Sequence, residues 1–208
     1  MFESFQSSTE EVFEMGDIIL ALSGPRACGK STIAKHLVNN HGYTRLAFAD
    51  PLREIAKCAG VQFIDDRNYL GRLGTTLREI WPRFLLDVVS QKIARIEGPV
   101  VIEDIRFPTE FDFCKSIGAI TIRLEISRDE QLKRLLSRNG IIGPDAEHLL
   151  DCVDEKLLTE ISEWDRNYVA EGDFQQLAAT LAEDMAEPCW ESCYILQRVP
   201  QNDSEVMY

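Results

Sequence analysis

The residues with the clearest chemistry lie in one short segment, 24–31, which reads GPRACGKS. It fits the pattern G-x-x-x-x-G-K-[ST], in which glycines let successive backbone N–H groups turn toward phosphate oxygens. The helix that follows adds the positive end of its dipole. Lys30 can reach the β- and γ-phosphates of a nucleoside triphosphate, and Ser31 can offer its hydroxyl oxygen to Mg²⁺. The pattern assigns phosphate binding to Gly24, Arg26, Gly29, Lys30, Ser31 and Thr32.

Further chemistry is expected where predicted strands end, because ligands of open α/β sheets gather at the carboxyl ends of the strands. Asp104 follows the apolar run 100–102 and could hold Mg²⁺ through water. The alternative is an aspartate that only caps a turn. Asp50, with Arg53 one turn along, follows another short strand at 43–49. Both aspartates are therefore candidate site residues.

Pairs of arginines are a second kind of candidate. Arg134 and Arg138 lie four residues apart on a predicted helix and project together toward the loop after it. Guanidinium groups form paired bonds to phosphate oxygens and stabilise the negative charge that spreads during transfer. The alternative is a solvated charged face paired with nearby acids. Arg78 and Arg83, on either side of Trp81, could likewise hold the phosphate of an acceptor.

The elements that position these residues alternate between strand and helix. An apolar run, 18–22, precedes the glycine-rich segment, and apolar residues recur at helical spacing after it. Further strands are predicted at 43–49, 100–106, 119–126 and 167–170; helices are predicted from 51 and at 84–96, 109–117, 129–138, 149–164 and 173–184, and an irregular connection at 60–75. This order predicts an α/β fold with a mostly parallel five-stranded sheet and helices on both faces.

The chain is expected to form one domain with an extension at each end. Residues 17–186 are enough to bury a core of their own. Residues 1–16 are polar and acidic, which predicts a loosely held arm. The tail, 187–208, carries Trp190 and Tyr194 among acids and prolines. It packs back on the domain or contacts a partner, and we favour packing back.

The charge balance and the cysteines exclude several classes of protein. With 35 acidic and 22 basic residues, the formal net charge of −13 argues against broad electrostatic binding to nucleic acid or to an anionic membrane. No apolar run approaches the length of a membrane span, and the acidic N-terminus does not resemble a secretory signal, so a cytoplasmic location is expected. Six cysteines without the spacings of a zinc site predict reduced thiols.

Two classes of nucleotide-binding protein are disfavoured by particular residues. Motor ATPases usually carry a water-activating glutamate directly after the metal-associated aspartate, where this chain has Ile105; Glu103 precedes Asp104 instead. GTPases usually recognise guanine with Asn-Lys-x-Asp, and no asparagine of this chain is followed by lysine. The sequence therefore favours neither a mechanical ATPase nor a GTPase.

Three segments together resemble a known family. They are 24–31, 48–53 (FADPLR) and 101–110 (VIEDIRFPTE), and their order and spacing resemble the bacteriophage-type deoxynucleoside monophosphate kinases and, more distantly, phosphomevalonate kinase. The similarity extends over roughly residues 17–180. It implies a three-layer P-loop kinase fold with a small lid at about 139–148, ATP as the phosphoryl donor and Mg²⁺ as its cation.

The resemblance also implies roles for individual residues. Lys30 and Ser31 serve the donor, and Arg134 with Arg138 leads into the closing lid. The acceptor site is lined by Asp50, Arg53, Arg78 and Arg106. Together with the motif analysis, this assigns catalysis to Lys30, Asp104, Arg134 and Arg138, and metal binding to Ser31 and Asp104. A phage-encoded member would act in the cytoplasm of the host.

Three functions fit these residues. The favoured one is ATP-dependent phosphoryl transfer to a deoxynucleoside monophosphate, whose phosphate is already ionised and needs no general base. A second is phosphorylation of a hydroxyl on a modified base, such as 5-hydroxymethyluracil in phage DNA, with Asp50 or Asp104 as the base. The third is a non-catalytic regulator that senses ATP. Only the second would take nucleic acid as substrate, and the sequence leaves open whether two copies form a homodimer.

Overall fold

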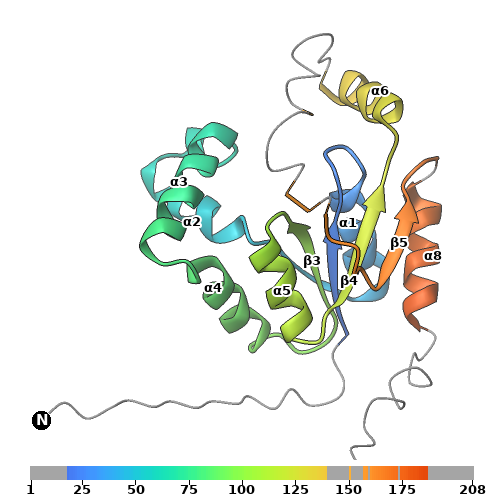
Figure 1. Cartoon of the computed structure of the whole chain (residues 1–208), viewed down its shortest axis with the longest axis horizontal. Helices are drawn as coiled ribbons and strands as arrows, with labels where there is room; N and C mark the ends of the chain where they lie inside the picture. Colours follow the sequence, from blue (N-terminus) through green and yellow to red (C-terminus); the bar gives the residue numbers. More distant parts are fainter. Residues whose placement is uncertain (1–17, 140–149, 151–156, 159, 173, 187–208) are drawn as a thin grey trace, which may run out of the picture.

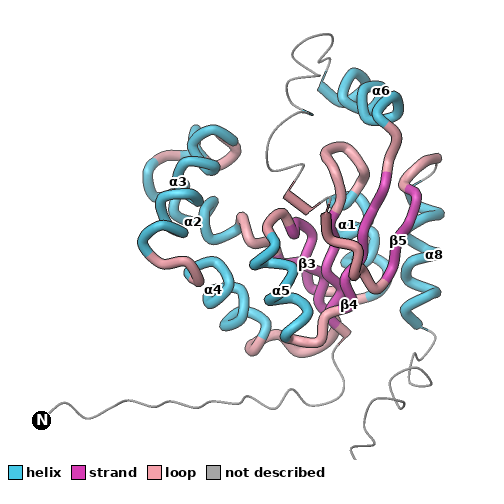
Figure 2. The backbone as a smooth tube through the Cα atoms, viewed as in Figure 1, coloured by secondary structure: helices cyan, strands magenta, loops and turns pink. Residues whose placement is uncertain are grey.

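The computed structural model describes residues 18–139, 150, 157–158, 160–172 and 174–186. In that part of the chain, five parallel strands form one sheet in the order β2-β3-β1-β4-β5 (Figures 1 and 2). The strands are β1 (Ile19–Ser23), β2 (Thr44–Leu46), β3 (Val100–Ile105), β4 (Ile120–Glu125) and β5 (Arg166–Val169). The predicted α/β fold with a parallel five-stranded sheet is therefore confirmed. The predicted arm (1–16), nearly all of the lid (139–148) and the tail (187–208) lie outside the described residues.

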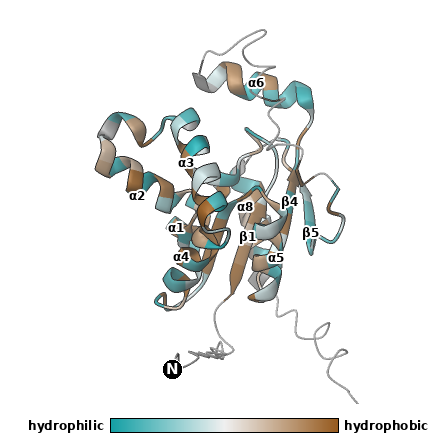
Figure 3. Cartoon of the chain, turned by 60° about the vertical axis from the view of Figure 1, so that its left-hand side comes forward, coloured by the Kyte–Doolittle hydropathy of each residue, from teal (hydrophilic) through white to brown (hydrophobic). Residues whose placement is uncertain are grey.

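The central strand, β1, is buried along its whole length. Its side chains alternate between the two faces of the sheet, as the pleat of a strand requires. Ile19 and Ala21 join one apolar cluster, and Leu20 and Leu22 join the other. Residues 19–22 of the strand are all apolar (Figure 3) because both faces of the sheet are covered, and the polar Ser23 ends the strand.

Helices cover both faces of the sheet (Figure 1). On one face, α4 (Phe84–Ile93) and α5 (Pro108–Ser116) pack on the cluster that contains Ile102. On the other face, α1 (Lys30–His41) and α8 (Phe174–Ala186) pack on the cluster that contains Leu20. Among the described residues, no helix has the length and apolar character needed to cross a bilayer.

The irregular connection predicted at 60–75 is wrong over most of its length. After a short 3-10 helix (Val61–Phe63), the chain forms α3 (Arg67–Ile80). Asp66 caps the start of this helix, because its Oδ1 accepts the N–H groups of Asn68 and Tyr69, both at 3.0 Å. A clear capping signal was therefore present in the sequence.

Packing explains why α3 forms although it contains two glycines. The helix α2 (Asp50–Ala59) packs with α3 and α4 around Leu52, Leu70 and Leu85. Gly74 allows this approach, since a Cβ at that position would lie 3.1 Å from a methyl group of Leu52. Each glycine costs a helix about 1 kcal/mol. Burial of the leucines outweighs that cost.

A second error concerns the helix predicted at 149–164. Where the structure describes its last part, from 157 to 164, the residues form turns and coil, and the rest lies almost entirely outside the described residues. Trp164 packs edge-on against Phe111 of α5, with 4.6 Å between ring centroids, and its Nε1 donates to the carbonyl of Ile161 at 2.9 Å. The segment is therefore held by tertiary contacts, which helical spacing of apolar residues does not reveal.

Gly24, directly after β1, lies where the backbone of a neighbouring strand leaves no room for a side chain. Its φ is 148°, and a Cβ would lie 2.6 Å from the carbonyl oxygen of Leu124 on β4. We expect Gly24→Ala to lower the free energy of unfolding by about 2–5 kcal/mol, because backbone strain and overpacking add. Chemical denaturation measures this loss.

The matched control is Gly42→Ala, which also has a positive φ, 70°, but faces open space. It should cost only the left-handed strain, about 1–2 kcal/mol. Equal losses in the two variants would contradict the account of Gly24.

Candidate active site

The glycine-rich turn, residues 24–29, connects β1 to α1 at the carboxyl edge of the sheet. Gly29 and Ala27 both have a left-handed backbone, with φ of 97° and 62°. The N–H groups of Thr32 and Ile33 donate to the carbonyl of Gly29 at 2.9 and 3.0 Å, and the N–H groups of Lys30 and Ser31 precede the first bond of the helix. Ser31 and Thr32, in that first turn, are exposed. The start of α1 is therefore open to an anion, as the motif predicts.

Lys30 folds its side chain across this turn. Its Nζ donates hydrogen bonds to the carbonyl oxygens of Gly24 at 2.6 Å and Pro25 at 2.9 Å, and lies 3.5 Å from the Sγ of Cys28. Within the described ranges, no carboxylate pairs with this ammonium group. Its positive charge is therefore offset only by neutral dipoles, which favours the approach of a phosphate.

The helix α6 (Arg128–Asn139) is attached to the same turn by two side chains. Gln131 Nε2 donates to the carbonyl of Arg26 at 2.8 Å, and Arg134 Nη1 donates to the carbonyl of Ala27 at 3.3 Å. Figure 1 shows α6 above the loop between β1 and α1. Arg134 therefore lies beside the phosphate-binding turn, and Arg138 follows on the same helix. Gln131, which is buried, gives no recognisable signal in the sequence.

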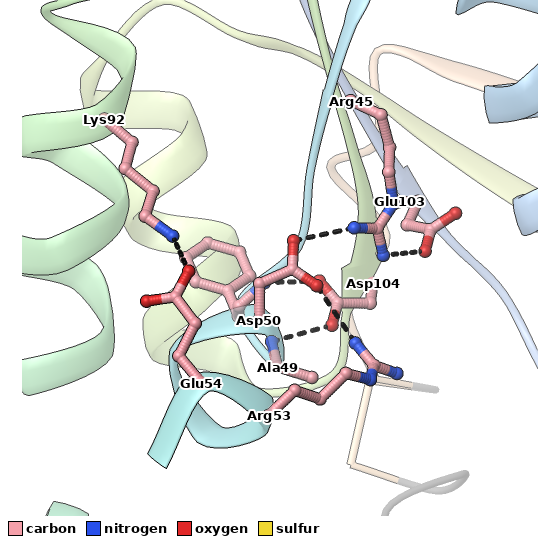
Figure 4. Close-up of polar contacts among 9 residues, drawn as sticks. Arg45, Ala49, Asp50, Arg53, Glu54, Lys92, Glu103 and Asp104 are labelled. Atoms are coloured by element: carbon pink, nitrogen blue, oxygen red, sulfur yellow. Dashed lines mark hydrogen bonds and ion pairs between the residues drawn. The ribbon is translucent and has the colours of Figure 1, made fainter. Parts of the chain in front are cut away.

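Asp104, near the end of β3, is buried and bonded to the backbone. Its Oδ1 accepts the N–H of Phe48 at 2.7 Å, and its Oδ2 accepts the N–H of Ala49 at 3.0 Å (Figure 4). Burial raises the pKa of Asp104, although the two N–H groups and the charge of Arg106 act in the opposite direction. The carboxylate therefore ties the turn before α2 to β3.

Asp50 begins α2 and lies between two arginines (Figure 4). Its Oδ2 is 2.7 Å from Arg45 Nη1, and its Oδ1 is 3.1 Å from Arg53 Nη1. The other terminal nitrogen of Arg45 bonds to Glu103. Burial alone would lower the pKa of Arg45, but the bonds to Glu103 and Asp50 outweigh it and raise the pKa above its ordinary value. The two arginines and the two acids of this group therefore balance in charge. Arg45 was not predicted from the sequence to belong to the site.

Glu110, in the first turn of α5, is buried with 2% of its surface exposed. Its Oε1 accepts a hydrogen bond from Arg78 Nη2 at 2.9 Å, and its Oε2 accepts the N–H groups of Arg106 at 2.9 Å and Phe107 at 3.2 Å. Burial raises the pKa of Glu110 to about 7, and the charge of Asp104 adds to this effect against the bonds from Arg106 and Arg78. No role was predicted for Glu110 from the sequence.

The structure separates the two arginines that flank Trp81. Arg78 lies over the ring of Phe107, with its guanidinium carbon 4.0 Å from the ring centroid. Arg83 is exposed and pairs at 3.3 Å with Asp87 of α4, the helix that begins directly after it. Arg78 therefore belongs to the charged group at the end of β3, and Arg83 does not.

The two halves of the site meet because β1 and β3 are neighbours. Ser23 pairs with Ile105 across the sheet, and Ser23 Oγ donates to the carbonyl of Ile105 at 3.2 Å. The phosphate-binding turn begins directly after Ser23, and the segment that carries Arg106 and Glu110 begins directly after Ile105. A triphosphate and a second anion can therefore be held side by side at one edge of the sheet.

Mg²⁺ fits this site through the exposed hydroxyl of Ser31. Among the described residues, no group of three or more histidines, cysteines or acids is placed to hold a metal ion. A cation that enters with a triphosphate brings phosphate oxygens and water as its further ligands. Each oxygen of Asp104 already accepts a backbone N–H, so this carboxylate is bonded to the turn before α2.

Comparisons with known proteins point to kinases. No protein-family model matches the chain. The protein named "Putative deoxynucleotide monophosphate kinase" of Acanthamoeba polyphaga mimivirus is 25% identical over an alignment of 144 residues, and the match covers 52% of this chain and 74% of the relative. Shikimate kinase from Bacteroides thetaiotaomicron has a TM-score of 0.55 and 16% identity, covering 82% of this chain and 98% of its own. The structure of TT1252 from Thermus thermophilus has a TM-score of 0.57 and 20% identity, and the match covers 83% of this chain and 98% of TT1252. The structural similarity supports the α/β fold, and the predicted enzyme class agrees with the names of the mimivirus relative and of shikimate kinase.

The raised pKa of Glu110 makes stability depend on pH in a direction that can be tested. The folded protein binds this proton more tightly than the unfolded chain, whose glutamate has a pKa of 4.5. The resulting stabilisation is complete below pH 4.5 and is lost as the pH rises to about 7. We expect the wild type to lose up to about 3 kcal/mol of unfolding free energy relative to Glu110→Gln over this range.

Urea denaturation at a series of pH values measures this difference. Glu54→Gln is the control, because Glu54 is exposed and pairs with Lys92 at 2.7 Å (Figure 4). It should follow the wild-type pH profile. A difference between wild type and Glu110→Gln that does not change with pH would contradict the expected titration.

Proposed function

We propose that this chain transfers the γ-phosphoryl group of ATP to a deoxynucleoside monophosphate and releases the diphosphate. The observation that carries this proposal is the adjacency of an open phosphate-binding turn and a group of arginines at the ends of two neighbouring strands. A kinase for a phosphorylated acceptor needs both, because its two substrates are anions that must be brought together.

On the donor side, the N–H groups at the start of α1 and the ammonium of Lys30 bind the β- and γ-phosphates. Lys30 exchanges its bonds to the carbonyls of Gly24 and Pro25 for bonds to phosphate oxygens. Bound Mg²⁺, held by Ser31 and through water by Asp104, would neutralise charge on the transferring group. Arg134 lies close enough to the turn to stabilise the same charge as it spreads.

On the acceptor side, Arg53, Arg78 and Arg106 bind the phosphate of the monophosphate. Arg106 is exposed at the end of β3. Arg53 and Arg78 are each held by one carboxylate, Asp50 and Glu110. An arginine that is already held in place loses less side-chain entropy when the substrate binds.

A monophosphate acceptor fits the site better than a hydroxyl acceptor. A hydroxyl needs a general base, and the sequence offers Asp50 and Asp104 for that role. Asp50 has both oxygens paired with arginines, and Asp104 has both bonded to backbone N–H groups. An ionised phosphate acceptor needs no base. The name of the mimivirus relative supports the same acceptor class.

Lys30→Ala tests the donor site. We expect kcat/KM to fall by about 100-fold or more, because removal of one preorganised donor to a transferring group typically costs that much. The assay follows labelled ATP with Mg²⁺ against the four deoxynucleoside monophosphates and against hydroxymethylated DNA. The control is Lys35→Ala, an exposed lysine on the same helix. Transfer by Lys30→Ala at a near wild-type rate would show that the donor site is wrongly assigned.

The α6 arginines should matter more for turnover than for ATP binding. In the double variant Arg134→Ala with Arg138→Ala, we expect kcat to fall by about 100-fold while the Kd for ATP changes by less than about fivefold, because the charge they stabilise develops during transfer. Lys133→Ala, an exposed lysine of the same helix, should leave both values near those of the wild type. Equal losses in kcat and ATP affinity would indicate ground-state binding instead.

A further inference from the structure

Glu110 stands apart from the other acids of the site because it bonds to two acceptor-side segments at once. One oxygen bonds to Arg78, which α3 supplies, and the other bonds to the backbone of Arg106 and Phe107, which follows β3. The bond between Arg78 and Glu110 joins residues 32 positions apart. The carboxylate itself is buried, so it is placed to fix other groups and not to meet a substrate.

Arg78 is held on three sides. Glu110 binds its Nη2, the ring of Phe107 lies under its guanidinium plane, and Nη1 lies against Gly74 of the preceding helical turn. A Cβ on residue 74 would lie 3.1 Å from that Nη1, closer than an ordinary van der Waals contact. The buried glycine therefore makes room for the guanidinium as well as for Leu52 of α2.

Burial makes this arrangement stiff. Burial of the Glu110 carboxylate costs free energy, as its raised pKa shows. Three hydrogen bonds, one of them from the charged Arg78, offset part of this cost. An unpaired Arg78 on α3 would sample many rotamers, and ordering it would weaken binding of the acceptor. The pairing removes much of that cost before the substrate arrives.

We propose that Glu110 is the positioning residue of the acceptor site, setting the Arg78 guanidinium and the Arg106 segment at a fixed separation for the phosphate of the incoming mononucleotide. This inference rests on the proposed function. Glu110 does not touch the substrate; it acts through the two arginines.

Steady-state kinetics separates positioning from a merely structural role. In Glu110→Ala, we expect the KM for the acceptor to rise by about tenfold or more, while the KM for ATP stays within about twofold. Glu110→Gln should show a smaller rise, because its amide oxygen can still accept the backbone N–H groups but its NH₂ group cannot accept from Arg78. A loss of general stability would instead affect both substrates alike.

A pair of glycine variants tests the same arrangement with Glu110 intact, in case Glu110→Ala fails to fold. Gly74→Ala should displace the Arg78 guanidinium and raise the acceptor KM, with the ATP KM unchanged. Gly71→Ala, in the same helix but facing open space, should stabilise the protein by the helix preference of alanine and leave both KM values unchanged. Equal acceptor KM values for these two variants, or no acceptor-specific change in Glu110→Ala, would overturn the positioning role.

Calorimetric titration with the four deoxynucleoside monophosphates distinguishes this failure from failure of the proposed function. If the wild type transfers phosphate and the variants show no acceptor-specific effect, the function stands and the positioning role falls. If the wild type binds a mononucleotide without transferring phosphate to it, the proposed function falls. The positioning role is then tested by the Kd for that mononucleotide, which should rise by about tenfold or more in Glu110→Ala. If the wild type binds none of the four, both proposals are overturned.

Discussion

The parallel pairing of β1 with β3 is the constraint on which the site depends. The two strands are separated in the sequence by 76 residues, but they are neighbours in the sheet, where Ser23 pairs with Ile105. This pairing places the phosphate-binding turn and the acceptor-side segment at one edge of the sheet. Since hydrogen bonds between central strands are fully buried, their spacing is fixed, and the distance between the two halves of the site is fixed with it.

Buried carboxylates then determine where the positive charges lie. Asp104 holds the turn that leads into α2, and Glu110 holds Arg78 and the segment after β3. Burial of each carboxylate costs free energy, and hydrogen bonds to the charged form offset part of that cost. In an acidic chain with a net charge of −13, such local pairing lets arginines gather at the edge of the sheet where the proposed acceptor would bind.

The donor turn is joined to α6 through the backbone and not through its phosphate-binding N–H groups. Gln131 and Arg134 bond to the carbonyls of Arg26 and Ala27. A movement of α6 therefore changes the position of the turn and of Arg134 together.

The sequence by itself determined the local features: the glycine pattern at 24–31, the apolar strands and their alternation with helices. These depend on neighbours within a few residues, so spacing reveals them. It failed at 60–75, where packing on Leu52 stabilises a helix that contains two glycines. Only the tertiary structure decided that Arg45 and Glu110 belong to the site and that Arg83 does not. Arg45 bonds across 58 residues and Glu110 across 32, and no local pattern encodes contacts at such separations.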